Sequence, residues 1–239
     1  MNRLMEDELS QNQFTNFFND AWEVLLKDLR LELRRKYEIY SIIILAFISN
    51  LSFGFSLGPS NPNVTDFISG MLWVSILFIG ILGFTTGFVR EMDRKTIEGL
   101  RVAPISPQAI LAGKTVYIFL LMCGGAIIII PSSMAILNYT FHSYGFLVLL
   151  VFALGILNIA VIGSIVSALA MYSQSRALII PALSMPLLPG TIIPSILATG
   201  KLTIGADLNA ILPELQINLG FLLLMIATLW ITFEYVLYD

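Results

Sequence analysis

The stretch from Tyr144 to Tyr172, YGFLVLLVFALGILNIAVIGSIVSALAMY, decides the fold class, because it is long, continuously apolar and free of charged residues. A helix rises about 1.5 Å per residue, so roughly 20 such residues cross the hydrocarbon core of a bilayer. Continuous runs favour helices over barrel strands, in which apolar residues alternate with polar ones. Five further stretches share this character: Ile39–Leu57, Phe67–Val89, Val116–Leu137, Ala177–Ala198 and Ile217–Val236. The sequence therefore predicts an all-α membrane protein with six transmembrane helices.

The composition supports this class. Hydrophobic residues make up 57% of the 239 residues and charged residues only 12%, whereas about 25% is usual in a soluble domain. The mean hydropathy is +0.85. A net charge of −3 gives no argument for a nucleic-acid partner. The single cysteine, Cys123, excludes an intrachain disulfide and a CxxC motif, and we interpret it as a packing residue.

Three segments follow from the pattern of charge. Residues 1–16 form a polar N-terminal tail, which we expect to be frayed, and residues 38–239 form the six-helix transmembrane domain with a cytosolic loop at 90–114. Residues 17–37 predict an amphipathic helix that lies along the membrane surface, although a solvated juxtamembrane helix also fits. Its apolar positions recur every three or four residues and its cations lie between them: Phe18, Trp22, Leu25, Leu29 and Leu33, with Lys27, Arg30, Arg34, Arg35 and Lys36.

The positions of lysine and arginine predict the orientation, since these residues concentrate on the cytosolic side of a membrane. With six spans and both termini in the cytosol, twelve of the 13 cations fall on the cytosolic side and only Lys201 falls outside. The same topology places Asn63 and Asn138, each in an N-glycosylation pattern, on the outer side.

The sequence lacks the features that are typical of several functional classes. No charged residue lies in the middle of a predicted span, which argues against a proton- or sodium-driven transporter. The chain has no Walker sequence for binding ATP, and nothing indicates a Ser/His/Asp hydrolase. We therefore predict a non-catalytic membrane subunit whose energy comes from another protein.

The fifth predicted span is unusual because it contains four prolines: Pro181, Pro186, Pro189 and Pro194. Each proline removes a backbone donor and clashes with the preceding turn. Two interpretations remain open: a broken or re-entrant segment in the outer leaflet beside a transport route, or a kinked structural helix.

His142, the only histidine, falls in the outer loop between the third and fourth spans. An ordinary interfacial residue is the simpler interpretation. An axial haem ligand is the alternative.

The cytosolic loop combines charged and apolar residues in a short segment. We predict one helix from Val89 to Leu100, with ion pairs between Glu91 and Lys95 and between Arg94 and Glu98. Pro104 and Pro107 end it, and its apolar groups suit a partner's groove: Met92, Ile97 and Leu100. A solvated loop that merely obeys the charge rule is the alternative.

The run from Glu91 to Lys114, EMDRKTIEGLRVAPISPQAILAGK, resembles the loop of the haem exporter B family, CcmB. That family has an acidic residue, then Thr-x-Glu-x-Leu-x-x-x-Pro, then Gly or Ala before Lys. The proline-rich Ile180–Pro189 and the basic Lys27–Arg34 are similar to family segments as well, so the resemblance covers nearly the whole chain. Two departures stand out: Lys95 occupies a position where the family commonly has glycine, and Gly99 falls inside the motif.

The resemblance implies an ABC-2-type permease that acts in maturation of c-type cytochromes, with haem as a candidate substrate. It implies a cytosolic CcmA-like ATPase, a CcmC-like membrane protein and a CcmE-like haem chaperone as partners, and two copies of this chain in the complex. ATP enters only through the ATPase. Spans one, two and five would line the moving interface, and the residues that couple to the ATPase would be Glu91, Thr96, Glu98, Leu100, Pro104 and Lys114.

Two mechanisms fit this family: haem itself crosses the membrane, or ATP-driven motion releases the loaded chaperone. The absence of paired histidines favours the second. Two other functions also remain open, namely an ABC-2-type permease for a lipid, drug or polysaccharide, and a membrane scaffold or carrier that works without ATP.

Overall fold

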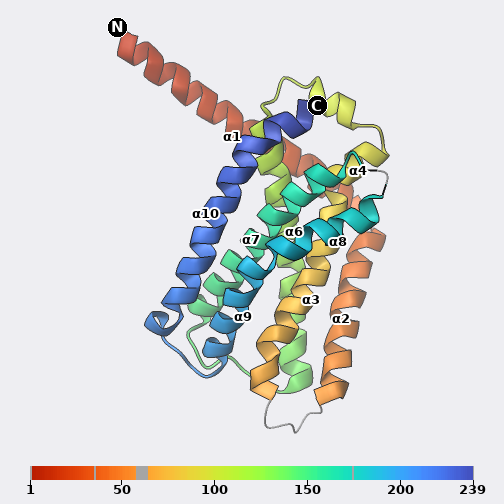
Figure 1. Cartoon of the computed structure of the whole chain (residues 1–239), viewed down its shortest axis with the longest axis vertical. Coiled ribbons are helices and arrows are strands. Elements are labelled where there is room, and N and C mark those ends of the chain that lie inside the picture. Colours follow the sequence, from red (N-terminus) through yellow and green to blue (C-terminus); the bar gives the residue numbers. More distant parts are fainter. Residues whose placement is uncertain (1, 35, 58–63, 174, 239) are drawn as a thin grey trace.

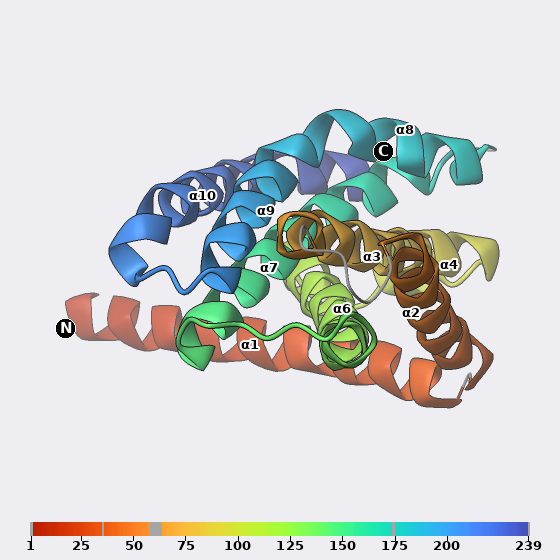
Figure 2. The same cartoon turned by 90° about the horizontal axis from the view of Figure 1, so that it is seen from below.

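In the computed structural model, which describes residues 2–34, 36–57, 64–173 and 175–238, every regular element of those ranges is a helix. Helices α2, α3, α6, α7, α9 and α10 lie side by side in a bundle, and α1 crosses one end of it beside α6 (Figures 1 and 2). The bounds are α1 Asn2–Arg34, α2 Lys36–Leu57, α3 Val64–Thr86, α4 Phe88–Asp93, α5 Ile97–Arg101, α6 Pro107–Leu137, α7 Gly145–Ala170, α8 Arg176–Leu187, α9 Pro189–Thr203 and α10 Leu208–Tyr238.

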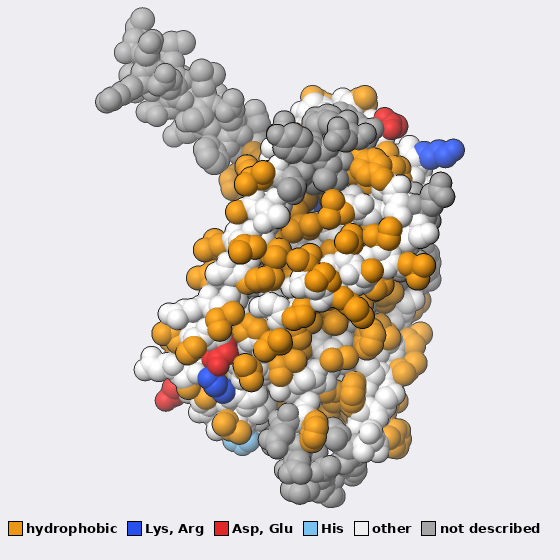
Figure 3. Space-filling model, in the orientation of Figure 1, with side chains coloured by type: hydrophobic (Ala, Val, Ile, Leu, Met, Phe, Trp, Pro, Cys, Tyr) orange, Lys and Arg blue, Asp and Glu red, His pale blue; other side chains and the backbone are white. Residues whose placement is uncertain are grey.

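Four helical segments of the described chain are long and apolar enough to cross a membrane: Phe67–Asp93, Pro107–Leu137, Gly145–Ala170 and Leu208–Ile231. The bent pair α8–α9 makes a fifth if it counts as one span, and α2 carries a shorter apolar stretch, Ile43–Ser56. Hydrophobic side chains cover the side of the bundle, while charged side chains lie near its ends (Figure 3). An all-helical membrane protein is therefore confirmed.

The proline-rich fifth stretch is divided into two helices by a bend, a result that agrees with the first of the two open interpretations, a broken or re-entrant segment. Helices α8 and α9 meet at an angle of 61°, with Pro189 at the start of α9. The backbone remains hydrogen-bonded across the bend, because Leu188 N donates to Ser184 O at 2.9 Å and Ile192 N donates to Leu188 O at 2.9 Å. The pair begins near α4 and ends at the opposite end of the bundle (Figure 1), as a bent span does.

Close packing between α3 and α7 holds the centre of the bundle. A Cβ atom at Gly155 would lie 2.2 Å from the Trp73 ring, and one at Gly163 would lie 2.1 Å from the Phe84 ring. The Trp73 ring also stacks on Phe152, with centroids 5.2 Å apart. Small residues of this kind let membrane helices approach closely where the hydrophobic effect gives little help.

Some predicted boundaries need correction. The polar N-terminal tail belongs to α1, which is helical from Asn2. Helix α6 begins at Pro107, where the Ser106 side chain accepts a hydrogen bond from Ala109 N as the N-cap, so Lys114 lies inside a helix and not in the loop. Asn138 is exposed and ends α6 with a left-handed φ of 51°, while Asn63 lies outside the described residues.

Candidate functional site at the α1–α4–α6 junction

The loop between α3 and α6 folds as two short helices, so the prediction of one helix from Val89 to Leu100 is wrong. The break comes at Lys95, whose φ of 57° is left-handed. Thr96 closes the turn, because its backbone N donates to Glu91 O at 2.9 Å and its hydroxyl donates to the same oxygen at 3.2 Å. The Thr96 hydroxyl also donates to the Glu91 carboxylate.

Glu91 turns inward from this loop, and its side chain is paired with two lysines from other helices. Its Oε1 lies 2.5 Å from Lys27 Nζ of α1 and 3.3 Å from Lys114 Nζ of α6. The predicted pair with Lys95 is therefore replaced by pairs with residues far away in the sequence. Glu91 is only 8% exposed, so the carboxylate belongs to the interior of the junction.

Lys114 is fully buried, and its ammonium group joins all three helices. It donates to Asp28 Oδ2 of α1 at 3.1 Å, to Glu91 of α4, and to the carbonyl of Gly87 at 3.4 Å. It also lies 5.1 Å from the centre of the Phe88 ring, a favourable position for a cation. A buried charge with this many partners fixes the relative positions of the helices that provide them.

Lys27 completes this group. Burial by itself would lower the pKa of Lys27, but the charge of Asp28 and a hydrogen bond to Glu91 raise that pKa above its ordinary value of 10.5. The side chain therefore remains a cation at neutral pH.

A second layer of ionic contacts lies next to the first. Both terminal nitrogens of Arg90 donate to Glu32 Oε2 at 3.0 Å, and the Tyr117 hydroxyl donates to the same oxygen at 2.8 Å. We call the two layers together the junction cluster; its members are Lys27, Asp28, Glu32, Arg90, Glu91, Lys114 and Tyr117. Three cations balance three carboxylates, so the buried charge is neutral overall.

The sequence of α1 explains how its acids reach the core. Asp28 and Glu32 are four residues apart and share a face with the buried Val24 and Leu25. At Gly113 of α6 a Cβ atom would lie 2.6 Å from the Ala21 carbonyl oxygen of α1. Glycine therefore permits α1 and α6 to approach closely, and the side chain of the next residue, Lys114, extends from α6 to Asp28 of α1.

The other residues predicted to couple to an ATPase are exposed or half-buried at the surface of the junction. Thr96, Glu98 and Pro104 are exposed, and Leu100 is half-buried against the core. Ile97 is 3% exposed, so it is not available to a partner's groove as we had expected.

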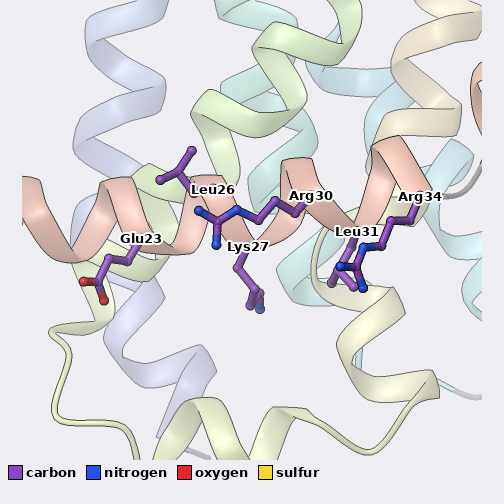
Figure 4. A pocket seen from close by; sticks show the side chains of 6 residues that line it. All are labelled: Glu23, Leu26, Lys27, Arg30, Leu31 and Arg34. Carbon is purple, nitrogen blue, oxygen red and sulfur yellow. The ribbon is translucent and has the colours of Figure 1, made fainter.

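Two hollows adjoin this surface on either side of Lys27 and Leu31. One, of about 400 Å³, lies between α1 and the α4–α5 loop and is lined in part by Arg94, Thr96 and Leu100. The other, of about 570 Å³, runs along α1 (Figure 4) and is lined by Glu23, Leu26, Lys27, Arg30, Leu31 and Arg34. The surface between α1 and the loop is thus mainly basic.

The family model for the CcmB protein matches residues 19–233, from the middle of α1 into α10. The chain belongs to the CcmB family. No curated protein matches it. CcmB proteins are membrane components of haem exporter ABC systems and work with other Ccm components, so this chain is a permease subunit of a transporter.

The contacts at the junction explain why the CcmB motif combines an acidic residue with a lysine. Its acidic residue, Glu91, and its Gly113-Lys114 pair meet in the junction cluster, although 23 positions separate Glu91 from Lys114. Sequence reasoning missed the partners on α1, Asp28 and Glu32. The available signal was two acids, four residues apart, on the same face of the helix as the apolar Val24 and Leu25.

Proposed function

We propose that this CcmB protein is the permease subunit through which a separate cytosolic ATPase drives haem export or the release of a haem chaperone. The observation that carries the proposal is Glu91, which ties the cytosolic loop to α1 through Lys27 and to α6 through Lys114. A push on the loop then reaches two long helices directly. No part of this transmission requires a flexible connection.

The residues divide into two roles. Glu98, Thr96 and Pro104 are exposed, and together with half-buried Leu100 they contact the ATPase. Glu91 and Lys114 are buried, so they position the loop and do not touch the partner. All six residues therefore contribute to coupling with the ATPase, four by direct contact and two, Glu91 and Lys114, by positioning the loop.

The basic surface of α1 contributes to the same docking site. Lys27 and Leu31 line both hollows, and Arg30 and Arg34 extend the positive charge along the helix. The docking surface therefore carries both signs of charge, so the partner needs acidic residues opposite the basic part of α1 and a basic residue opposite Glu98.

The topology that suits this role has six spans, with α2 as the first and the α8–α9 pair as the fifth, and both termini in the cytosol. The last described turns of α10 and the α4–α5 loop lie at the same end of the bundle (Figure 1), as an even number of crossings requires. Helix α1 lies along the cytosolic membrane surface, with exposed Phe18, Trp22 and Leu33 in contact with lipid.

The proposed complex has an ABC-2-type architecture and contains two copies of this chain, because two ATPase subunits need two membrane halves. A CcmA-like ATPase, a CcmC-like membrane protein and a CcmE-like chaperone complete it. The sequence has no Walker motif, so in this scheme ATP is hydrolysed by the separate ATPase subunit.

The test is capture of the ATPase encoded beside this chain by the detergent-purified protein. We expect Glu98→Lys to abolish capture, because it reverses an exposed charge on the docking surface. The matched control is Thr140→Lys, which adds the same side chain at an exposed position at the other end of the bundle. Equal capture by the native chain and by both variants would remove Glu98 from the interface, and no capture by the native chain would overturn the ATPase coupling.

A further inference from the structure

A network of polar side chains lies in the centre of the bundle, away from the junction cluster. It includes Asn158, which stands midway along α7. Asn158 Nδ2 donates to the carbonyl oxygen of Asn218 in α10 at 3.0 Å and to that of Leu154 in its own helix at 3.3 Å. Asn158 is 0% and Asn218 1% exposed. Two carboxamides at membrane depth are therefore turned away from lipid and toward other helices.

Helix α9 supplies most of the other members of the network. Thr191, Ser195 and Thr199 follow one another at four-residue intervals, so they share one face of α9, and all three are fully buried. Asn218 Nδ2 donates to Ser195 Oγ at 3.0 Å, and the Thr191 hydroxyl donates to Asn218 Oδ1 at 3.3 Å. Trp73 Nε1 of α3 donates to Thr199 Oγ1 at 2.9 Å. The network therefore joins α3, α7, α9 and α10.

The same face of α9 continues to the end of the bundle opposite the junction cluster. Thr203, four residues after Thr199, is only 3% exposed. His142 Nδ1 lies 2.9 Å from the Thr203 carbonyl oxygen, and since a carbonyl can only accept, Nδ1 carries the proton. His142 thus fastens the end of this face to the connection between α6 and α7.

One acceptor of the network lacks a donor. The described residues provide no hydrogen bond to Asn158 Oδ1, although this side chain is fully buried. Rotating the amide by half a turn would not help, because Nδ2 faces two carbonyl oxygens and an oxygen in its place would be repelled by both. A buried acceptor without a donor is destabilising, and in proteins such atoms are commonly bonded to an internal water molecule.

The occupant of this position must be small and must donate a hydrogen bond, and water fits these conditions better than a cation. A hard cation takes several oxygen ligands, whereas Asn218 Oδ1 and Ser195 Oγ already accept hydrogen bonds within the network. Helices α7 and α9 contain no Asp or Glu that would balance the charge of a cation. A neutral donor needs no such balance.

A second acceptor lies in the same part of α9. Pro194 has no N–H, so the carbonyl oxygen of Gly190, four residues earlier, lacks its usual helical donor. Gly190 packs against α10 close to Asn218, because a Cβ atom there would lie 2.6 Å from the ring of Phe221. The polar region around the network is therefore richer in acceptors than in donors.

We propose that a water molecule is bound in the centre of the bundle, where it donates a hydrogen bond to Asn158 Oδ1. The water completes the polar contact between α7, α9 and α10, which is otherwise surrounded by apolar side chains. It thereby helps to hold the second helix of the bent α8–α9 pair in place. The site is formed entirely within this chain and depends neither on the ATPase nor on the cargo.

The test is water-edited solid-state NMR of the ¹⁵N-labelled full-length chain in lipid bilayers. We expect magnetisation from water to reach the side-chain amides of Asn158 and Asn218 several-fold faster than the backbone amides of Ile162 and Val166, which are fully buried in α7. Asn158→Leu removes the acceptor, so transfer to the Asn218 side chain should fall to the rate at Ile162. The matched control is Ser164→Ala, which removes a fully buried hydroxyl of α7 outside the network and should leave the transfer to Asn218 unchanged.

Two results would overturn the proposal. Transfer to Asn158 that is as slow as transfer to Ile162 in the native chain would show that the site is dry, and this measurement needs no variant. Fast transfer to Asn218 that persists in a folded Asn158→Leu chain would place the water elsewhere. The sample contains no ATPase, so a failure of ATPase capture leaves these outcomes unchanged, and the two proposals fail separately.

Discussion

Lys95 shows how one residue can weaken the loop it belongs to. Its φ of 57° lies in the left-handed region, which costs a residue with a Cβ atom about 1–2 kcal/mol and glycine almost nothing. The CcmB family commonly has glycine at this position, which the turn between α4 and α5 now explains. The departure from the family pattern is therefore a strained residue and not a change of fold.

We accordingly expect Lys95→Gly to stabilise the protein by about 1 kcal/mol, provided that the gain in the turn exceeds the added freedom of the unfolded chain. Thermal unfolding in detergent measures this as a rise in the midpoint. Lys95→Ala removes the same charge but keeps the Cβ atom, so it serves as the control and should give no such rise. A stabilised alanine variant would assign the effect to the charge.

Lys114, in contrast to the exposed Lys95, is a buried cation that is stabilised by the carboxylates around it. We expect Lys114→Met to destabilise the protein by about 3–5 kcal/mol, since it leaves the carboxylate of Asp28 without its main partner in the interior. Adding Asp28→Asn removes the stranded charge, so the double variant should lose less than the sum of the two single variants. Strictly additive losses in chemical denaturation would mean that the two groups are not coupled.

At the scale of the helices, the crossing of α1 over α6 depends on Gly113. A methyl group there would lie 2.6 Å from a backbone oxygen of α1, and backbone cannot move aside as a flexible side chain can. We expect Gly113→Ala to displace α1 and to cost about 1–3 kcal/mol. Proteolysis of α1 in the folded protein should become faster, because the helix loses contact with the bundle.

Gly124 of the same helix provides the comparison. Nothing lies within 4 Å of a Cβ atom built there, so Gly124→Ala should be neutral or stabilise by up to about 1 kcal/mol, as alanine favours the helix. Similar losses for the two variants would point to a general effect of alanine on α6 and not to the crossing.

The helices also show what a sequence pattern can and cannot predict. The apolar runs located α2, α3 and α7 within about three residues, because length and hydropathy are local properties. The prolines located the break between α8 and α9 for the same reason. Helices α6 and α10 begin at Pro107 and Leu208, nine residues before the predicted spans, because each helix continues beyond its apolar run. The pattern failed in the α4–α5 loop, where charges four residues apart suggested one helix but Glu91 instead pairs with Lys27, 64 positions away.

The junction cluster lay beyond prediction for a related physical reason. Periodicity assigns Asp28 and Glu32 to one face of α1, but it does not say which helix that face meets. The meeting of α1 with α6 brings Asp28 to Lys114 across 86 positions. In the same way, His142 was visible as the only histidine, whereas its bond to Thr203 depends on the pairing of two distant connections.

At the scale of the whole molecule, six crossings assign each connection between the spans to one side of the membrane. In a background of Cys123→Ala, single cysteines at Glu23, Lys95 and Ser175 should resist a membrane-impermeant maleimide applied to intact cells, while cysteines at Thr140 and Asp207 should react. All five positions are exposed in the structure, so burial does not decide the result. Reaction of Lys95→Cys from outside would mean that α2 and α3 do not both cross. Protection of Asp207→Cys together with Ser175→Cys would mean that the bent α8–α9 pair enters and leaves on the same side, and the route for cargo would then have to be sought elsewhere than beside α9.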